Sequence, residues 1–198
     1  MTETAPPERD ERSDMDRLSD LFPRFGGLPT GTRAALRRMD PEAPGRSAAA
    51  LFAALETAKL SRQLGRMGAA DAADTMRRWA TIVQVAALLS GTGGARAHRP
   101  GRELGRAVAA AGYSEARMMR LLAARGPALR GAVVRLARFL ASRGAQPVDL
   151  RPLAALVLHE GRNEERAEAA RLRIARGFFS SGATSGGNDD TNENRNTA

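Results

Sequence analysis

The fold is decided by the stretch P-A-L-R-G-A-V-V-R-L-A-R-F-L-A-S at residues 127–142. Its large apolar side chains recur at i, i+4, i+7 and i+11, at Leu129, Val133, Leu136 and Leu140. That spacing forms a single apolar stripe along an α-helix, and no strand would place these residues on one face. Arg130, Arg135 and Arg138 lie off the stripe at 100° per residue, so we expect them to face solvent or a ligand.

The same composition continues on both sides of this stretch. Residues 15–179 are rich in Ala, Leu and Arg and poor in β-branched and aromatic residues, without the alternation typical of strands. The sequence therefore predicts an all-α protein, a compact bundle of about eight to nine helices. Clusters of proline and glycine separate the expected helices, which cover residues 16–21, 31–39, 46–60, 70–89, 102–111, 114–124, 127–142, 150–158 and 163–179.

Three further features concern the organisation of the chain. The glycine-rich segment at 91–101 leaves an arrangement in two helical lobes open. Ser114 and Asp149 each carry a side-chain oxygen able to cap a helix N-terminus, with Glu115 and Pro152 just inside the helix. Residues 180–198 lack the large apolar side chains that would repay ordering, and residues 1–14 are acidic and contain prolines, so we expect two disordered tails around a helical domain at 15–179.

Charge is distributed unevenly along the 198 residues. The chain has 31 Lys and Arg against 22 Asp and Glu, and one of those bases, Lys59, is lysine. Acids outnumber bases in residues 1–16 and in residues 180–198, which leaves a net charge of about +15 on residues 17–179. Guanidinium groups bind phosphate with a planar fork of donors, so a nucleic-acid partner is the leading inference from charge. The competing interpretation is a solvated, arginine-rich surface.

Several classes of chemistry find no support. The chain has no cysteine and two histidines, which excludes disulfides and thiolate sites, and His159 and Glu160 are neighbours that cannot share a helix face. Asp71 and Asp74, at i and i+3, could ligate a hard cation, but acids are also favoured at a helix start. We expect no catalytic residues, no metal and no cofactor. Without an apolar run near 18 residues or a signal peptide, we expect a cytoplasmic protein without membrane contact.

Arginine is most concentrated between residues 102 and 138. Eight arginines and two acids fall there, too few acids for salt bridges alone to explain the run. Arg117 and Arg120, at i and i+3, share a helix face, while Met118 and Leu121 turn to the core. Aromatics are scarce, so we expect backbone contact with little base reading. Tyr113 is the one candidate for stacking on a base, although packing would equally explain it.

Five segments in order resemble the CasB family, the small subunit of the type I-E CRISPR Cascade complex. They are G-T-R-A-A-L-R-R from Gly31, M-R-R-W with V-A-A-L-L-S, G-R-E-L-G-R-A-V-A, S-E-A-R-M-M-R-L-L and V-V-R-L-A-R-F-L. The similarity covers about residues 15–179. It departs near the end, where the family often has tryptophans and this chain has His159, Glu160 and Gly161.

The resemblance implies an all-helical, non-catalytic protein that joins other Cascade subunits and a second copy of itself. It further implies backbone contacts to guide RNA and target DNA, including the displaced strand. The basic positions that the resemblance carries over are Arg38, Arg77, Arg106, Arg117, Arg138 and Arg162. Adding arginines from the helix faces completes the expected nucleic-acid-binding set: Arg38, Arg77, Arg106, Arg117, Arg120, Arg135, Arg138 and Arg162.

Two alternatives remain from the residues alone. The helices expected at 114–124 and 127–142, with a short turn between them, could form a helix-turn-helix regulator that binds duplex DNA as a dimer. Against this, the second helix offers only arginine and apolar residues, where base reading usually uses Asn, Gln, Ser or Thr. The other alternative is a helical scaffold that binds protein and no nucleic acid.

Overall fold

The computed structural model describes residues 14–60, 68–90 and 96–182. The described helices are α1 (Asp14–Arg24), α2 (Thr30–Arg38), α3 (Ala48–Thr57), α5 (Ala69–Leu89), α6 (Leu104–Ala110), α7 (Glu115–Ala123), α8 (Gly126–Ser142), α9 (Arg151–His159) and α10 (Glu164–Gly182), with 3-10 turns at Phe25–Gly27 and Pro44–Ser47. Within these ranges no strand occurs, only one isolated bridge between His98 and Val148. The all-α prediction is confirmed, with helix ends shifted by a few residues.

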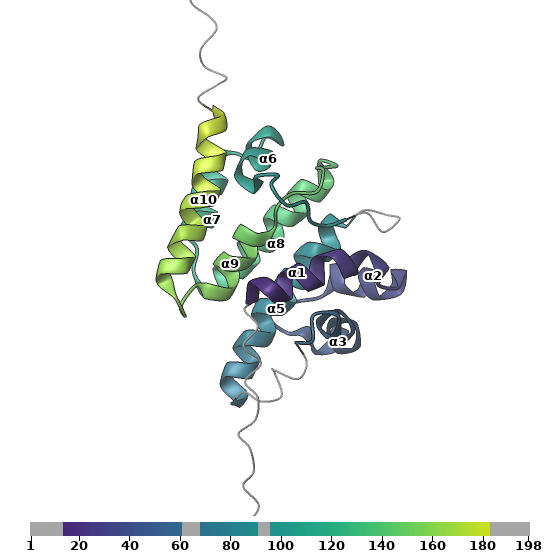
Figure 1. Cartoon of the computed structure of the whole chain (residues 1–198). Coiled ribbons are helices and arrows are strands. Elements are labelled where there is room, and N and C mark those ends of the chain that lie inside the picture. Colours follow the sequence, from purple (N-terminus) through teal and green to yellow (C-terminus); the bar gives the residue numbers. More distant parts are fainter. Residues whose placement is uncertain (1–13, 61–67, 91–95, 183–198) are drawn as a thin grey trace, which may run out of the picture.

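Helix α5 lies at the centre of the bundle and explains its arrangement. It packs against α8, α2, α9 and α3, and Figure 1 shows it among helices from both halves of the chain. From Trp79 to Ala87 its side chains are buried in an almost unbroken run. A helix segment that is buried on every face needs neighbours on every side, so the other helices surround it.

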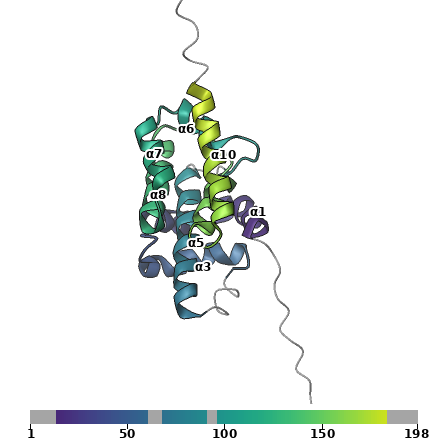
Figure 2. The ribbon, with the colours of Figure 1, turned by 90° about the vertical axis from the view of Figure 1, so that its left-hand side faces the viewer.

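The chain does not divide into two lobes at the glycine-rich segment. Helices from before and after it contribute to one hydrophobic core, which joins Leu18, Leu36 and Leu55 to Leu136 and Leu156. The stripe of α8 is part of this core, because Leu129, Val133, Leu136 and Leu140 are each 1% exposed or less. The turned view in Figure 2 shows α5 between α8 and α10.

Local details differ from prediction in three places. The helix expected at 46–60 is split into the 3-10 turn Pro44–Ser47 and α3. Ser114 is the N-cap of α7 but makes no capping side-chain hydrogen bond, so that prediction is wrong. Asp149 does accept a hydrogen bond from the Arg151 backbone N–H at 3.0 Å, although the N-cap of α9 is Leu150. Helix α10 continues through Gly182, into the range assigned to a tail. The tails predicted at 1–14 and 180–198 otherwise lie almost wholly outside the described residues.

Helices α6 and α10 cross at a contact between two glycines. A Cβ on Gly105 would lie 2.5 Å from the Phe178 backbone nitrogen and still closer to the Ile174 carbonyl. A Cβ on Gly177 would lie 3.3 Å from the Gly105 Cα. The two backbones therefore touch directly, and only glycine fits at Gly105 without moving a helix.

We expect Gly105→Ala to lower the free energy of unfolding by about 2–3 kcal/mol, because the methyl group would push α6 from α10. Chemical denaturation measures this loss. The control is Gly31→Ala, where a Cβ would meet nothing within 4 Å. An equal effect of the two substitutions would contradict the close crossing.

His98 joins two loop segments that lie far apart in sequence. Its Nδ1 accepts a hydrogen bond from the Leu150 backbone N–H at 3.0 Å, so this nitrogen carries no proton. The imidazole stacks on Phe22, with ring centroids 4.6 Å apart. Burial lowers the pKa of His98, and the nearby charge of Arg151 acts in the same direction while Asp149 opposes it.

The lowered pKa makes stability depend on pH with a defined sign. Below about pH 6.5 the unfolded chain binds a proton at His98 that the folded chain resists. We therefore expect the contribution of His98 to be complete above that pH and to be lost as the pH falls through it. The pKa values of Asp74 and Asp149 are also lowered, so their contributions are lost only at more acidic pH, below about 4.

We expect His98→Asn to flatten the pH dependence of unfolding between about pH 5 and 7, because an amide oxygen can accept the Leu150 N–H without titrating. Denaturant unfolding of both proteins across this range measures the difference. Parallel curves would show that His98 does not carry the effect.

Candidate nucleic-acid interface

Three of the predicted arginines meet at one cavity between α7 and α8. The cavity has a volume of about 660 Å³. Arg117 and Arg120 border it from α7 and Arg135 from α8, and all three are exposed. Its full lining, here called the arginine cavity, is Tyr113, Arg117, Arg120, Leu121, Ala123, Ala124, Ala128, Ala132, Arg135 and Phe139.

Helix periodicity explains how the arginine cavity forms. Arg117 and Arg120 share the outer face of α7, while Met118 and Leu121 are buried, as predicted. On α8 a second stripe runs at i, i+4, i+7 and i+11 through Ala128, Ala132, Arg135 and Phe139. The two alanines leave space where larger side chains would fill it. This second stripe can be found in the sequence, although the stripe of large apolar residues on the same helix is the more conspicuous pattern.

The electrostatic environment of the cavity is uniformly positive. The described residues that line it include three arginines and no carboxylate. Burial raises the pKa of the Tyr113 phenol, although the charges of Arg117, Arg135 and Arg120 lower it in part. All three guanidinium groups thus act on the same hydroxyl.

The two aromatic rings at the cavity, Tyr113 and Phe139, pack on each other and have different further neighbours. The centroids of Tyr113 and Phe139 lie 5.0 Å apart with the planes tilted by 59°. The Arg143 guanidinium lies over the Phe139 ring, 5.4 Å from its centroid. Tyr113 therefore packs on Phe139 and also borders the cavity, so packing does not exclude contact with a ligand.

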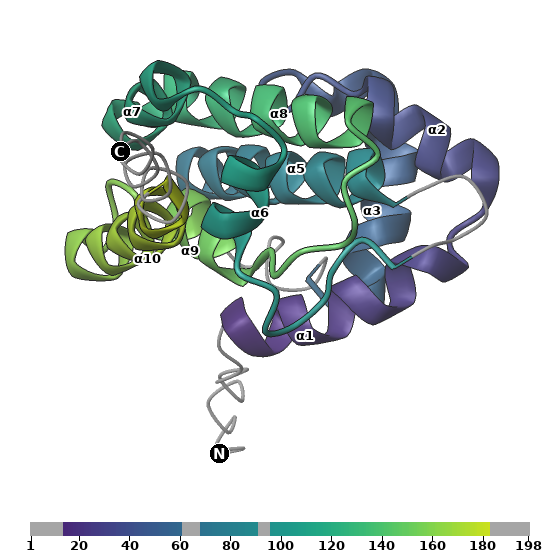
Figure 3. The same ribbon diagram turned by 90° about the horizontal axis from the view of Figure 1, so that it is seen from above.

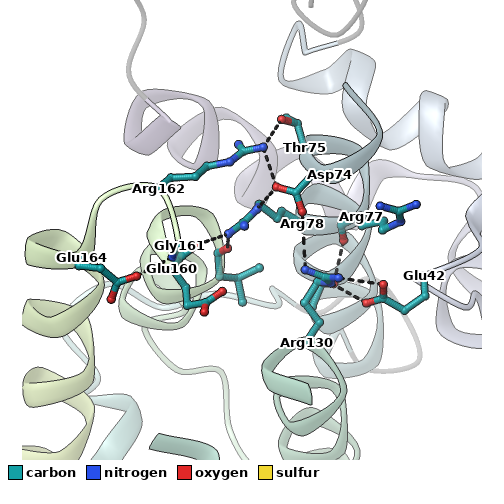
Figure 4. Close-up of polar contacts among 12 residues, drawn as sticks. Glu42, Asp74, Thr75, Arg77, Arg78, Arg130, Glu160, Gly161, Arg162 and Glu164 are labelled. Atoms are coloured by element: carbon teal, nitrogen blue, oxygen red, sulfur yellow. Dashed lines mark hydrogen bonds and ion pairs between the residues drawn. The ribbon is translucent and has the colours of Figure 1, made fainter. Parts of the chain in front are cut away.

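A second group of arginines surrounds Asp74, and two of them, Arg78 and Arg130, are buried. The Asp74 cluster consists of Asp74, Arg78, Arg130, Arg162 and Glu42 (Figure 4). Asp74 Oδ2 accepts hydrogen bonds from Arg78 Nε at 2.7 Å and from Arg162 Nη2 at 2.8 Å. Arg130 Nη1 lies 3.8 Å from Asp74 Oδ1. Burial would raise the pKa of Asp74, but the hydrogen bond from Arg78 and the three positive charges outweigh it and lower that pKa.

Each buried arginine of the Asp74 cluster has further partners. Arg130 binds Glu42 through two hydrogen bonds, of 2.5 and 2.8 Å. Arg78 Nη1 donates to the carbonyls of Val157 and Glu160, both at 2.7 Å, at the C-terminal end of α9. The side chains of Arg130 and Arg78 are 7% and 8% exposed. The expectation that Arg130 faces solvent or a ligand is therefore wrong, because acids distant in sequence neutralise it inside the bundle.

The other predicted site residues are dispersed. Arg38 is exposed at the end of α2, and Arg138 is exposed on α8 but does not line the cavity. Arg77 is half-buried on α5 and points away from Asp74 in Figure 4. Arg106 is exposed on α6, with its Nη2 3.6 Å from a Glu103 carboxylate oxygen. Arg162 is bound to Asp74 and also to Thr75 Oγ1 at 2.8 Å.

The described residues contain neither a metal-binding cluster nor a membrane-spanning helix. Among the described residues no group of three or more His, Cys, Asp or Glu could hold a metal ion, and Asp74 is engaged by arginines. None of the described helices combines the length and the apolar character needed to cross a bilayer.

We expect Arg130→Ala to lower the free energy of unfolding by about 2–3 kcal/mol, because Glu42 loses its partner and a buried side chain is removed. The effect stays below that of a fully buried pair, since Glu42 is 39% exposed and can be hydrated.

Arg135→Ala, five residues further along α8, is the matched control and should change stability by less than about 0.5 kcal/mol. Denaturant titration of both variants makes the comparison. A similar small loss at both positions would contradict an internal role for Arg130.

Comparison with known protein families shows which family this chain resembles. A family model described as CRISPR-associated protein Cse2 matches residues 32–179, which include every helix from within α2 to within α10. Comparisons with curated proteins and with solved structures gave no match. The matched range contains the arginine cavity, the Asp74 cluster and all eight predicted arginines. Since the model covers well over half of the sequence, the chain belongs to the Cse2, or CasB, family, the small subunit of the type I-E CRISPR Cascade complex.

Proposed function

We propose that this small subunit is non-catalytic and binds nucleic-acid backbones without regard to sequence, using the face formed by α7 and α8. The observation that carries the proposal is the convergence of Arg117, Arg120 and Arg135 on one exposed site without a carboxylate in its described lining. Arg120 Nε donates to the Ala116 carbonyl at 3.1 Å, but none of the three guanidinium groups is paired with a described carboxylate. They are therefore more available to phosphate oxygens than those of Arg78 and Arg130, which bind carboxylates.

The geometry suits a strand that runs along the edge of the molecule. Figures 2 and 3 show α7 and α8 along one edge of the bundle, where a polymer can approach from solvent. Arg138 and Arg106, exposed on α8 and α6, are further candidates for phosphate contact. Arg162 is a weaker candidate, because a phosphate would compete there with Asp74.

The role in Cascade follows from the energetics of strand exchange. When guide RNA invades a duplex, the base pairs formed and lost are nearly balanced, so backbone contacts can decide the outcome. Arginines that hold the displaced strand or the guide–target duplex would stabilise the opened state, while sequence is read by the RNA. We also propose, from the family, that the chain works beside other Cascade subunits and a second copy of itself in the cytoplasm.

The helix-turn-helix alternative is less compatible with α8. A reading helix must enter the major groove with one side exposed. In α8 eight residues are buried, including Arg130, Ala132 and Val134 in addition to the apolar stripe. Helix α8 is therefore mainly a core helix, with one exposed face that carries Arg135 and Arg138.

The test is the triple variant Arg117→Ala, Arg120→Ala and Arg135→Ala. We expect weaker binding to unrelated single strands by similar factors, because phosphate contacts carry no sequence information. If each arginine neutralises one phosphate, the salt slope should fall by about 2 in total, roughly 0.7 per contact. Binding titrations at several salt concentrations measure both quantities.

The matched control removes three exposed arginines of α10, Arg166, Arg173 and Arg176. It loses the same charge at another location, so its salt slope should change less. Equal slopes for the two triple variants would mean that only net charge matters. A loss confined to one target sequence would favour a regulator.

A further inference from the structure

The arginine cavity has an apolar interior that phosphate contacts alone do not use. Seven of its ten lining residues are alanine, leucine, phenylalanine or tyrosine, and the arginines supply the remainder. Its volume of about 660 Å³ falls in the range of about 300–1,000 Å³ typical of small-molecule sites. A backbone phosphate bound to Arg117 or Arg135 would leave this interior exposed to water.

We propose that the arginine cavity accepts one unstacked nucleobase, whose flanking phosphates are held by Arg117, Arg120 and Arg135. This inference rests on the proposed function and adds to it a base-binding site of low sequence preference. The ligand it requires has a flat apolar ring beside negative charge, which describes a nucleotide within a single strand.

Tyr113 is the residue that would contact the base. It lies between Gly112, which has a positive φ of 80°, and the N-cap of α7, so a turn positions the ring at the cavity. One face of Phe139 is covered by Arg143, which leaves Tyr113 as the better surface for stacking. The Tyr113 phenol, like tyrosine generally, is neutral at physiological pH and can donate a hydrogen bond.

Charge favours an anionic occupant such as nucleic acid over a basic segment of protein. Three arginines act together on the cavity, and the described residues that line it offer no acid to pair with a basic peptide. None of the described residues that line the cavity belongs to a strand, so a peptide could not bind there by adding a strand to a sheet edge. Base stacking on an aromatic ring tolerates every base, which agrees with binding that ignores sequence.

The experiment compares two single strands of about 15 nucleotides, oligothymidylate and an abasic strand with the same phosphates. We expect the full chain to bind the intact strand roughly 5- to 150-fold more tightly, the gain from stacking one base. Tyr113→Leu should remove this difference and leave abasic binding unchanged, whereas Tyr113→Phe should retain it. Melting of each variant confirms folding.

A direct signal is also available, because Tyr113 is the only tyrosine in the chain. With ¹³C-labelled tyrosine, its ring resonances should shift upfield on addition of oligothymidylate and hardly move with the abasic strand.

The outcomes separate the two proposals. Equal binding of both strands, lost in the triple arginine variant, would overturn the base site and leave the proposed function standing. Absence of binding to either strand would overturn both. If the tyrosine signal moved on mixing with nucleic-acid-free Cascade subunits and no further with DNA, the cavity would hold a protein segment and the base site would be wrong.

Discussion

The arrangement of the helices depends on the ion pairs between the Asp74 carboxylate and the arginines around it. This carboxylate projects from α5, the central helix, and meets guanidinium groups from α5, α8 and the turn between α9 and α10. Placing Arg78 and Arg130 in the interior is favourable only when their donors are satisfied. Asp74, Glu42 and the carbonyls at the end of α9 supply the acceptors, so these elements must meet at one relative position (Figure 4).

The same residue type therefore performs two distinct tasks in this protein. Some arginines bind helix ends or partly exposed carboxylates: Arg37 donates to the Ala87 and Ser90 carbonyls at the end of α5, and Arg125 to three carbonyls at the end of α7. Others, such as Arg117 and Arg135, remain exposed at a cavity. The high arginine content consequently overstates the number of charges that a polyanion can reach.

Much of the fold could be predicted from sequence, because helix periodicity and proline and glycine clusters are local signals. The stripe of Leu129 to Leu140 and the ends of α5 and α8 follow from these signals. The partner of Arg130 could not be predicted, since Glu42 is 88 residues away and only tertiary packing brings it near. The sequence correctly predicts that Arg130 lies off the apolar stripe of α8. On that side of the helix, however, the side chain meets Glu42 and Asp74 and not solvent.

The candidate site was predictable in part for the same reason. The face shared by Arg117 and Arg120 is set by spacing within one helix, and Arg135 by its angle on another. That these faces meet at a cavity depends on how α7 and α8 pack, which spacing alone does not determine. The family resemblance, and not helix spacing, points to Arg38 and Arg77, and neither residue lines the cavity.

The arginine cavity has one consequence for how the protein would respond to its surroundings. Its described lining contains guanidinium groups and a phenol whose pKa is raised, and it contains neither imidazole nor carboxylate. The side chain that ordinarily changes protonation between weakly acidic and weakly alkaline conditions, histidine, is absent from that described lining. Counterion concentration, rather than proton concentration, is then the variable that tunes this surface, so acidification of the surroundings would leave its attraction for anions intact.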